Sequence, residues 1–238
     1  MPDEALAAFL RQNATGLGIR VHTRGPVCFA VPSMAFVYAD WTFPFLIQLL
    51  RGEWQPHDAF MYKLDTLIAY ARNDLVRDFL KTRCEYLAFV DNDTLPPQGW
   101  TTALARHDKP VISALYHLKR EPYNPVLYKG LEYKEDEGRW DYTPYETLPP
   151  KGPVEVDGCG MGAVLIKRAV IEAIKPPWFK EQGGGEDFYF CREAQRAGYT
   201  IWADPEVQCL HIGTNAITTG HWLAFQEMAK QDLANKVQ

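Results

Sequence analysis

The chain has 238 residues, of which 47% are hydrophobic and 23% are charged, and its formal net charge is −5. This composition is typical of a globular protein with one large domain or two small ones, and the lack of a long basic run argues against nucleic acid as the main partner. The five cysteines form no CxxC pair, which favours reduced thiols in the cytoplasm over a disulfide framework or a zinc site. No apolar run reaches the roughly 18 residues of a membrane-spanning helix, and the first residues do not resemble a signal peptide.

Strands and helices alternate along the predicted chain. Apolar runs predict buried strands at 27–32, 86–90 and 110–116. Helices are expected at 3–13 and at 57–83, where apolar residues recur at spacings of three and four. A strand, a long helix and a second strand in this order favour a right-handed crossover, and therefore a parallel sheet.

The second half of the chain begins with a change in character. Residues 119–153 are rich in Pro, Tyr, Glu and Gly, which predicts a hairpin or a mobile excursion rather than part of the core. We expect an apolar strand running into a helix at 162–174, a helix at 186–197 that ends at Gly198, and a polar helix after residue 213. The whole is predicted to be one α/β domain whose ligands lie at the carboxyl ends of the strands.

The main motif is FVDNDTLPP, in which Asp91 and Asp93 follow the apolar run 86–90. Buried carboxylates need a partner, and the neighbouring sequence offers none. Residues i and i+2 of an extended segment point the same way, so both carboxylates could converge on one cation, and oxygen ligands suit Mn²⁺ or Mg²⁺. The alternative is that both acids are turn residues at a strand end. An aspartate-nucleophile phosphatase is disfavoured, because Leu95 stands where its D-x-D-x-[TV] motif requires Thr or Val.

Two further acids and a histidine extend this set. Glu186 and Asp187 fall in the first turn of a predicted helix, directly after three glycines. The helix dipole stabilises acids at this position, so both could serve the helix start alone. An ionised carboxylate there could also accept a proton from a substrate hydroxyl. His211, in CLHIG, is either an ordinary histidine or, beside a carboxylate pair, an additional metal ligand.

Six segments, taken in order, resemble glycosyltransferases of the GT-A fold, in particular the family 2-like enzymes. They are AVPS (30–33), ARN (71–73), YLAFVDNDTLPP (86–97), VDGCGMGAVLIKRAV (156–170), GEDFYFCREAQRAGY (185–199) and HIG (211–213). The resemblance implies a single Rossmann-like domain over 1–238, with a mostly parallel sheet flanked by helices. Its parts would be a nucleotide-sugar-binding half at 27–118, a variable excursion at 119–153, an acceptor and catalytic half at 154–213, and a C-terminal tail at 214–238.

The resemblance also implies contacts with the donor. Pro32 and Ser33 lie where the family cradles the nucleotide base, and Arg72 lies where it often contacts the nucleotide or its phosphates. From the sequence alone, Arg72 could equally be a surface residue of a helix. Asp91 would lie near the ribose. The turn around Gly160 would let the donor sugar or the acceptor approach the backbone, although glycines equally permit a plain tight turn.

The same resemblance implies the metal ligands and the catalytic base. Asp91, Asp93 and His211 would hold Mn²⁺ or Mg²⁺ on the donor diphosphate, so that the metal would be the missing partner of the two acids. Asp187 would be the catalytic base, and Glu186 would contact the sugar or the acceptor.

The sequence therefore predicts a metal-dependent glycosyltransferase of the hexosyltransferase type, which moves a sugar from a nucleotide-sugar donor to an acceptor hydroxyl. A nucleotidyltransferase shares the sheet and the acid pair, but it would normally carry a glycine-rich loop with Arg or Lys after the first strand. Residues 31–43 contain none of these three residue types. A third alternative is a non-catalytic carbohydrate-binding protein on a decayed transferase fold. The identities of donor and acceptor, and the choice between retention and inversion at the anomeric carbon, stay open.

Overall fold

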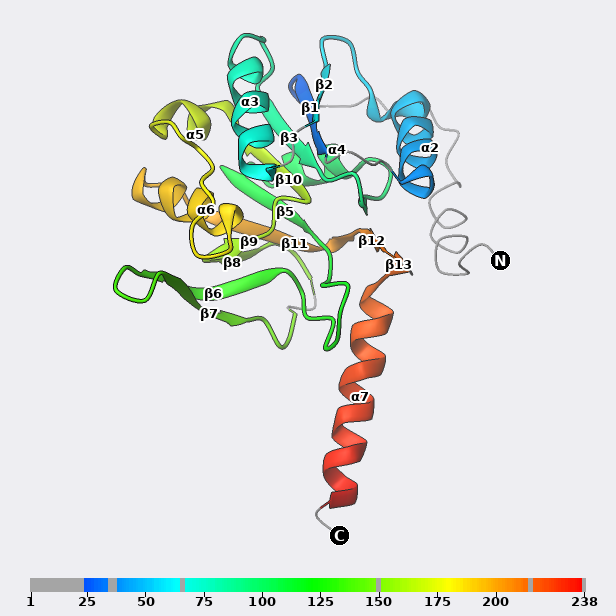
Figure 1. Cartoon of the computed structure of the whole chain (residues 1–238). Coiled ribbons are helices and arrows are strands. Elements are labelled where there is room, and N and C mark those ends of the chain that lie inside the picture. The colour runs from blue at the N-terminus through cyan, green and yellow to red at the C-terminus, as the bar shows by residue number, and fades with distance from the viewer. Residues whose placement is uncertain (1–23, 34–37, 65–66, 149–150, 214–215, 237–238) are drawn as a thin grey trace.

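The computed structural model describes residues 24–33, 38–64, 67–148, 151–213 and 216–236, whose arrangement is shown in Figure 1. A seven-stranded sheet runs through the molecule in the order β2 (Ala59–Leu64), β1 (Val27–Ser33), β3 (Tyr86–Val90), β10 (Ala163–Lys167), β5 (Val111–Leu115), β11 (Ile201–Gln208) and β8 (Val154–Val156). Within this sheet β10 and β8 run against the direction that the other strands share. The prediction of an α/β fold with a mostly parallel sheet is confirmed.

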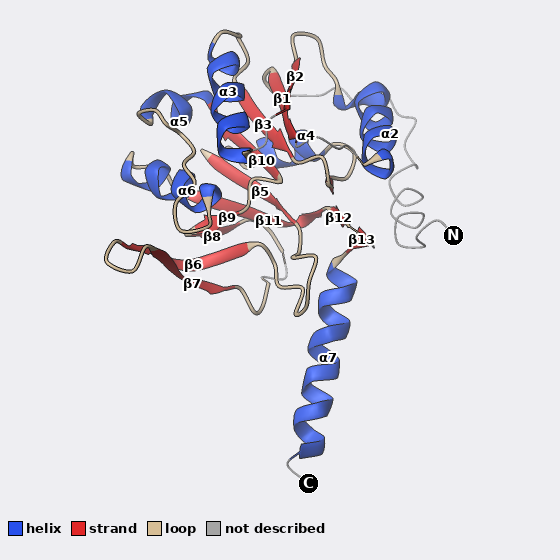
Figure 2. Ribbon diagram, in the orientation of Figure 1, coloured by secondary structure: helices blue, strands red, loops and turns tan. Residues whose placement is uncertain are grey.

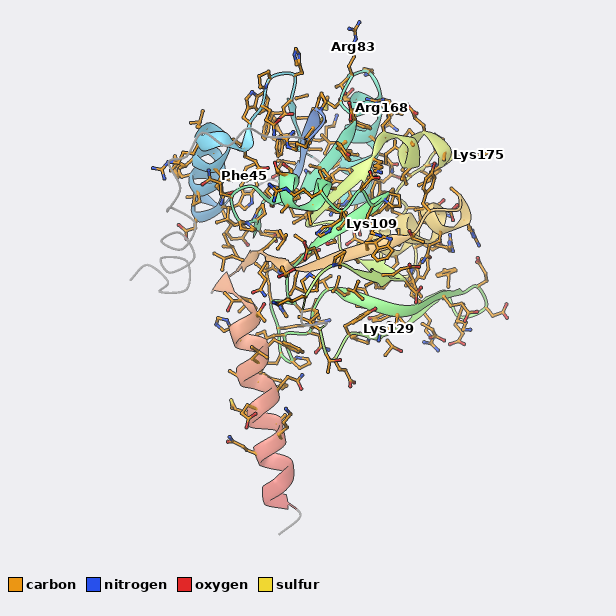
Figure 3. The ribbon with its side chains drawn as sticks, turned by 180° about the vertical axis from the view of Figure 1, so that it is seen from behind. Phe45, Arg83, Lys109, Lys129, Arg168 and Lys175 are labelled. Atoms are coloured by element: carbon orange, nitrogen blue, oxygen red, sulfur yellow. The ribbon has the colours of Figure 1, made fainter. Side chains whose placement is uncertain are left out.

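Helices cover both sides of this sheet (Figure 2). One side carries α3 (Ile68–Leu80), α5 (Arg168–Ala173) and α6 (Glu186–Arg196). The other side carries α2 (Ala39–Gln48), its continuation η1 (Leu49–Glu53) and α4 (Trp100–Ala105). Phe79 and Phe190 are buried in the first core, whereas Phe45, labelled in Figure 3, and Trp100 are buried in the second. Because successive strand residues point to opposite faces, each central strand contributes to both cores.

Two three-stranded sheets complete the fold. One consists of β13 (Ala216–Ile217), β12 (Leu210–Ile212) and β4 (Thr94–Leu95), and the other of β7 (Arg139–Pro144), β6 (Leu127–Lys134) and β9 (Gly158–Cys159). The pair β6–β7 confirms the hairpin predicted within 119–153. The expectation that this region lies outside the core was wrong, because Leu127, Trp140 and Tyr145 are buried. The aromatic residues of this region therefore contribute to the packing of the core.

The predicted helix over 57–83 was wrong in its first part. Ala59–Leu64 form the edge strand β2, which pairs in parallel with β1, and α3 begins at Ile68. The side chains of β2 alternate between partly buried and exposed, so their period is two residues. Met61 and Leu64 happen to continue the three-and-four spacing of the helix that follows, and the apolar pattern therefore extended too far.

The remaining predictions concern three helices, membrane-spanning segments and the cysteines. The helix at 186–197 is confirmed, and Gly198 ends it with a φ of 89°, as a residue after a helix often does. The polar C-terminal helix is confirmed as α7 (Thr219–Lys236), which extends away from the rest of the molecule (Figure 1). The predicted helix at 3–13 lies outside the described residues. In the described part of the chain, no helix is long and apolar enough to cross a membrane. All five cysteines are free and buried.

Candidate active site

The carboxyl ends of β1 and β3 lie side by side, because these strands pair in parallel. Pro32 and Ser33 end β1 and are buried. The side-chain amide of Asn92, which follows β3, donates a hydrogen bond to the Ser33 hydroxyl at 2.8 Å. The AVPS segment and the acidic motif are thus joined at the carboxyl ends of these two strands, where ligands bind in open α/β sheets. Contact of Pro32 and Ser33 with a nucleotide base stays a prediction.

Arg72 is a buried residue and not a surface residue of α3. Its side chain is 2% exposed, and its guanidinium lies 5.2 Å and 5.9 Å from the ring centroids of Phe89 and Phe179. Two edge-to-face aromatic rings therefore enclose the charge. Asn73 explains why Phe179 is there: its side-chain oxygen accepts hydrogen bonds from the backbone N–H groups of Trp178 and Phe179. The ARN segment thus fixes the loop that covers its own arginine.

Three carboxylates surround this guanidinium. Arg72 Nη2 lies 3.0 Å and 3.1 Å from the two oxygens of Asp91, and 3.8 Å from Asp187 Oδ1. Arg72 Nε lies 3.4 Å from Glu186 Oε1. We refer to these four residues as the Arg72 cluster. The structure therefore brings together four of the residues predicted for the site, from α3, the end of β3 and the start of α6.

The Arg72 cluster has more negative than positive charge. Burial opposes the charge of Arg72, but the nearby carboxylates Asp91, Asp187 and Glu186 raise its pKa. Burial raises the pKa of Asp91, and Asp93 adds to this effect, against the lowering effect of Arg72. Burial and the neighbouring Glu186 raise the pKa of Asp187 well above its ordinary value. A carboxylate with a raised pKa is a better proton acceptor near neutral pH.

Several polar atoms of this cluster have no hydrogen-bond partner. They are Arg72 Nη1, Asp91 Oδ1 and Asp187 Oδ1, and all three are buried. The short distance from Asp91 Oδ1 to Arg72 Nη2 does not have the geometry of a hydrogen bond, which the guanidinium makes with Asp91 Oδ2 instead. Buried polar atoms without partners are uncommon. At the carboxyl ends of strands, they indicate groups that can form hydrogen bonds or ion pairs with a ligand.

Asp187 is held by the glycine-rich turn. Its Oδ2 accepts a hydrogen bond from the backbone N–H of Met161 at 3.2 Å, while the N–H of Gly162 donates to the Tyr116 hydroxyl at 3.0 Å. A Cβ atom at Gly160 would overlap the Tyr116 hydroxyl, so glycine is explained there by packing. A contact between Gly160 and a donor sugar stays a prediction. Asp187 therefore does more than begin α6, because its side chain joins that helix to the turn and to Arg72.

The acidic motif forms a turn rather than the extended segment that we expected. The N–H of Thr94 donates to the carbonyl of Asp91 at 3.0 Å, which closes a β-turn over 91–94. The alternation of an extended strand therefore does not apply, and the two carboxylates face different partners. Asp91 faces Arg72, and Asp93 Oδ2 lies 2.6 Å from Lys119 Nζ.

His211 reaches Asp93 through strand pairing. β12 pairs with β4, and the N–H of Ile212 donates to the carbonyl of Asp93 at 2.6 Å. His211 Nε2 then lies 3.7 Å from Asp93 Oδ1. We refer to Asp93, Lys119 and His211 as the Asp93 group. Burial opposes ionisation of Asp93, but His211 and Lys119 outweigh it and lower the pKa of Asp93 to about 2.

The tautomer of His211 suits a metal ligand. Its Nδ1 lies 2.7 Å from the carbonyl oxygen of His117, which can only accept, so Nδ1 carries the hydrogen. In the neutral ring, Nε2 then presents a lone pair toward Asp93. Histidines that bind metals commonly donate their second N–H to a carbonyl in this way. The pair Asp93–His211 therefore fits a divalent cation.

The predicted set of three metal ligands is not assembled. Among the residues that the structure describes, no group of three or more His, Cys, Asp or Glu side chains is arranged to hold a metal ion. Asp91 would have to give up part of its contact with Arg72 to join Asp93 and His211. The assignment of these residues to a metal remains a prediction.

Some residues of the site could not be found from the sequence. Lys119 lies in a loop without a motif, Tyr116 ends an ordinary apolar run, and Phe179 is 107 residues from Arg72 in the sequence. Only the segment ARN carried a signal, because a buried asparagine on an apolar helix face needs partners in another segment. Packing brings all three residues to the site.

Comparisons with known proteins support the fold. No protein-family model and no curated protein matches the sequence. Among solved structures, A197 from STIV is similar, with a TM-score of 0.62 and 23% identity over 82% of this chain and 91% of that chain. The glycosyltransferase GalNAc-T7, in a crystal structure with UDP, GalNAc and Mn²⁺, is similar with a TM-score of 0.54 and 11% identity over 85% of this chain. This chain spans 48% of the GalNAc-T7 chain. The fold is consistent with the Rossmann-like GT-A type.

Proposed function

We propose that this protein is a metal-dependent glycosyltransferase, which transfers a sugar from a nucleotide-sugar to an acceptor hydroxyl. The observation that carries the proposal is that two groups of charged residues, the Arg72 cluster and the Asp93 group, include the two acids that flank Asn92 in the sequence. The Arg72 cluster has excess carboxylates, and the Asp93 group has a carboxylate facing a histidine of suitable tautomer. Both groups lie at the carboxyl ends of the strands, where ligands bind in such sheets. The likeness of the fold to GalNAc-T7 supports the same class of reaction.

The metal would be held mainly by Asp93 and His211, with Asp91 as the nearest further carboxylate. A bound Mn²⁺ or Mg²⁺ would neutralise the negative charge of the departing nucleoside diphosphate. Both ions accept carboxylate ligands, and the sequence provides no thiolate in these positions. The nucleotide itself would lie along Pro32, Ser33 and Asp91, next to the end of β1.

Among the described residues of the site, Asp187 is the one suited to accept the proton. Its side chain is 25% exposed, and its Oδ1 has no hydrogen-bond partner. The acceptor oxygen forms a bond to the anomeric carbon as the bond from that carbon to the diphosphate breaks. The diphosphate leaves with the bonding electron pair, and the acceptor proton moves to Asp187. Arg72 stabilises the ionised form of Asp187 before this step, and Glu186, beside it, would position the sugar or the acceptor.

The direct test is a panel of nucleotide-sugars, assayed for release of nucleoside diphosphate with Mn²⁺ and with EDTA. One or more donors should be consumed with Mn²⁺ and none with EDTA. In parallel, the same donors should raise the melting temperature of the protein, because ligands that bind the native state stabilise it. If no donor in the panel is turned over or raises the melting temperature in the presence of Mn²⁺, the proposal is wrong. A donor that binds without turnover, on any acceptor tried, would favour a carbohydrate-binding role.

A further inference from the structure

Lys119 lies against the carboxylate that the proposed function assigns to the metal. Its Nζ is 2.6 Å from Asp93 Oδ2, while His211 faces the other oxygen of Asp93. The Lys119 side chain is 32% exposed, and its ammonium lies 5.7 Å from the centroid of the Tyr38 ring. It is therefore a solvent-accessible cation in contact with a metal ligand.

A divalent cation at Asp93 would weaken the ion pair between this ammonium and Asp93. The ion would bring two further positive charges next to Lys119, and like charges at such short range repel each other. The contact can survive only if an anion compensates the added charge. A lysine side chain has four flexible carbons, and this one is partly exposed, so it can leave Asp93 without disturbing the core.

Arg72 does not have this freedom. Its guanidinium is buried between two aromatic rings and is shared by three carboxylates. Its charge is already committed to the protein, whereas the charge of Lys119 is paired with one carboxylate that a metal can take over. Of these two cations, Lys119 is the one that can move to meet a ligand, whereas Arg72 stays in place and has only its Nη1 atom without a partner.

We propose that Lys119 is an exchangeable counter-ion, which neutralises Asp93 in the metal-free protein and binds the donor diphosphate once the metal is in place. This inference rests on the proposed function, because it requires a metal at Asp93. The diphosphate that the metal binds would lie within reach of the displaced ammonium. Lysine is a common phosphate ligand that acts as a point charge, so the two negative phosphoryl groups provide the compensation that the metal makes necessary.

The first measurement is binding of Mn²⁺ alone, followed through the electron paramagnetic resonance signal of the free ion. Lys119→Met keeps an unbranched side chain that is one atom shorter and removes its charge, so the variant should bind Mn²⁺ about three- to tenfold more tightly than the wild type. The matched control is Lys63→Met. Lys63 also contacts an aspartate, Asp74, at 2.8 Å and is 41% exposed, but it lies on the edge strand β2. This control should bind Mn²⁺ as the wild type does.

The second measurement is calorimetric binding of inorganic pyrophosphate at saturating Mn²⁺, which needs no knowledge of the donor base or sugar. Lys119→Met should weaken this binding by about tenfold, the cost of one lost charge-assisted contact, whereas Lys119→Arg should largely restore it. The opposite signs of the two effects are the signature of an exchangeable counter-ion.

The possible results separate this inference from the proposed function. If the wild type binds neither Mn²⁺ nor pyrophosphate, the metal site of the proposed function is wrong and the role of Lys119 falls with it. If the wild type binds both, and Lys119→Met binds both equally well, only the role of Lys119 is wrong. A variant that binds Mn²⁺ more weakly would also overturn it, because Lys119 would then support the metal and not compete with it.

Discussion

The Arg72 cluster and the Asp93 group contain the two acids that flank Asn92 in the sequence, and they have different charge balances. In the Arg72 cluster, one buried guanidinium is shared by three carboxylates, and the side chain of Arg72 is enclosed by aromatic rings. In the Asp93 group, one carboxylate lies between an ammonium and an imidazole, and Lys119 is one-third exposed. The difference teaches that the Arg72 cluster is a fixed part of the fold whose carboxylates can gain or lose a proton. In the Asp93 group, by contrast, a ligand can replace the partners of the carboxylate. Substitutions in the first should therefore alter stability, and substitutions in the second should alter binding.

The largest effect is expected from Arg72→Met. The substitution leaves three carboxylates in a buried site without their common partner, and loss of one partner of a buried ion pair typically costs about 3–5 kcal/mol of unfolding free energy. The loss should be smaller at about pH 5 than at pH 7, because burial has raised the pKa values of Asp91 and Asp187 and both accept protons early as the pH falls. Urea denaturation at the two pH values measures both quantities.

The control for this variant is Arg77→Met on the same helix. Arg77 pairs with Asp74 at the surface, and its side chain is 57% exposed. Exposed ion pairs contribute little, so its unfolding free energy should stay close to that of the wild type. Equal losses for the two variants would show that Arg72 does not neutralise the carboxylates around it.

The second prediction concerns Asp187→Asn and combines turnover with stability. If Asp187 accepts the acceptor proton, turnover should fall by about 10² to 10⁴. The pKa of Asp187 is raised in the folded protein, so this carboxyl favours folding when protonated, and that contribution is lost as the pH rises through the folded pKa. Above that pH the ionised carboxylate costs stability, and the asparagine variant should melt at a higher temperature than the wild type.

Glu193→Gln on the same helix is the matched control for Asp187→Asn. Glu193 pairs with Arg192 and Arg196 outside the Arg72 cluster. It should lose little turnover and gain no stability. A residue that only begins α6 would behave differently from our expectation, because Asp187→Asn would then lower the melting temperature and keep wild-type kinetics.

The sequence predicts this site only as far as local patterns reach. The apolar run before Asp91 and the three glycines before Glu186 mark a strand end and a helix start, and the structure confirms both elements. The sequence could not decide whether Arg72 is buried, because burial depends on Phe179 from a distant loop. It also could not place Lys119, since a lysine in a loop has no pattern that reveals its partner.

Turns and edge strands were the other source of error. The two acids of FVDNDTLPP were expected in an extended segment, but the hydrogen bond from Thr94 to Asp91 closes a turn that separates them. The strand β2 was assigned to a helix because Met61 and Leu64 have the three-residue spacing of a helix face, although in the strand they point to opposite sides and Leu64 is exposed. In both cases the deciding interaction is a backbone hydrogen bond, which side-chain patterns describe poorly.

The third prediction tests the Asp93 group. Asp93→Ala should abolish measurable Mn²⁺ binding, because it removes the anionic ligand, and His211→Ala should weaken Mn²⁺ binding by about 10- to 100-fold. Neither variant should lose much stability compared with Arg72→Met, since the partners of Asp93 are partly exposed. Mn²⁺ titration and urea denaturation of the same samples provide both values. Wild-type Mn²⁺ affinity in Asp93→Ala would exclude this group as the metal site.

The smallest effect is expected where the glycine-rich turn supports Asp187. A Cβ atom at Gly160 would overlap the Tyr116 hydroxyl and would also lie too close to Val126, so Gly160→Ala should cost about 1–3 kcal/mol of unfolding free energy through overpacking. Tyr116→Phe removes the hydroxyl and leaves the N–H of Gly162 without its acceptor, which should itself cost about 1–3 kcal/mol. If the overlap dominates, the double variant should lose less than the sum of the two single variants, and a double-mutant cycle measured by urea denaturation gives this coupling. Additive losses would mean that the turn moves away from Tyr116 to admit the methyl group. Gly160→Ala would then displace Met161, whose N–H holds Asp187, and would lower turnover as well as stability.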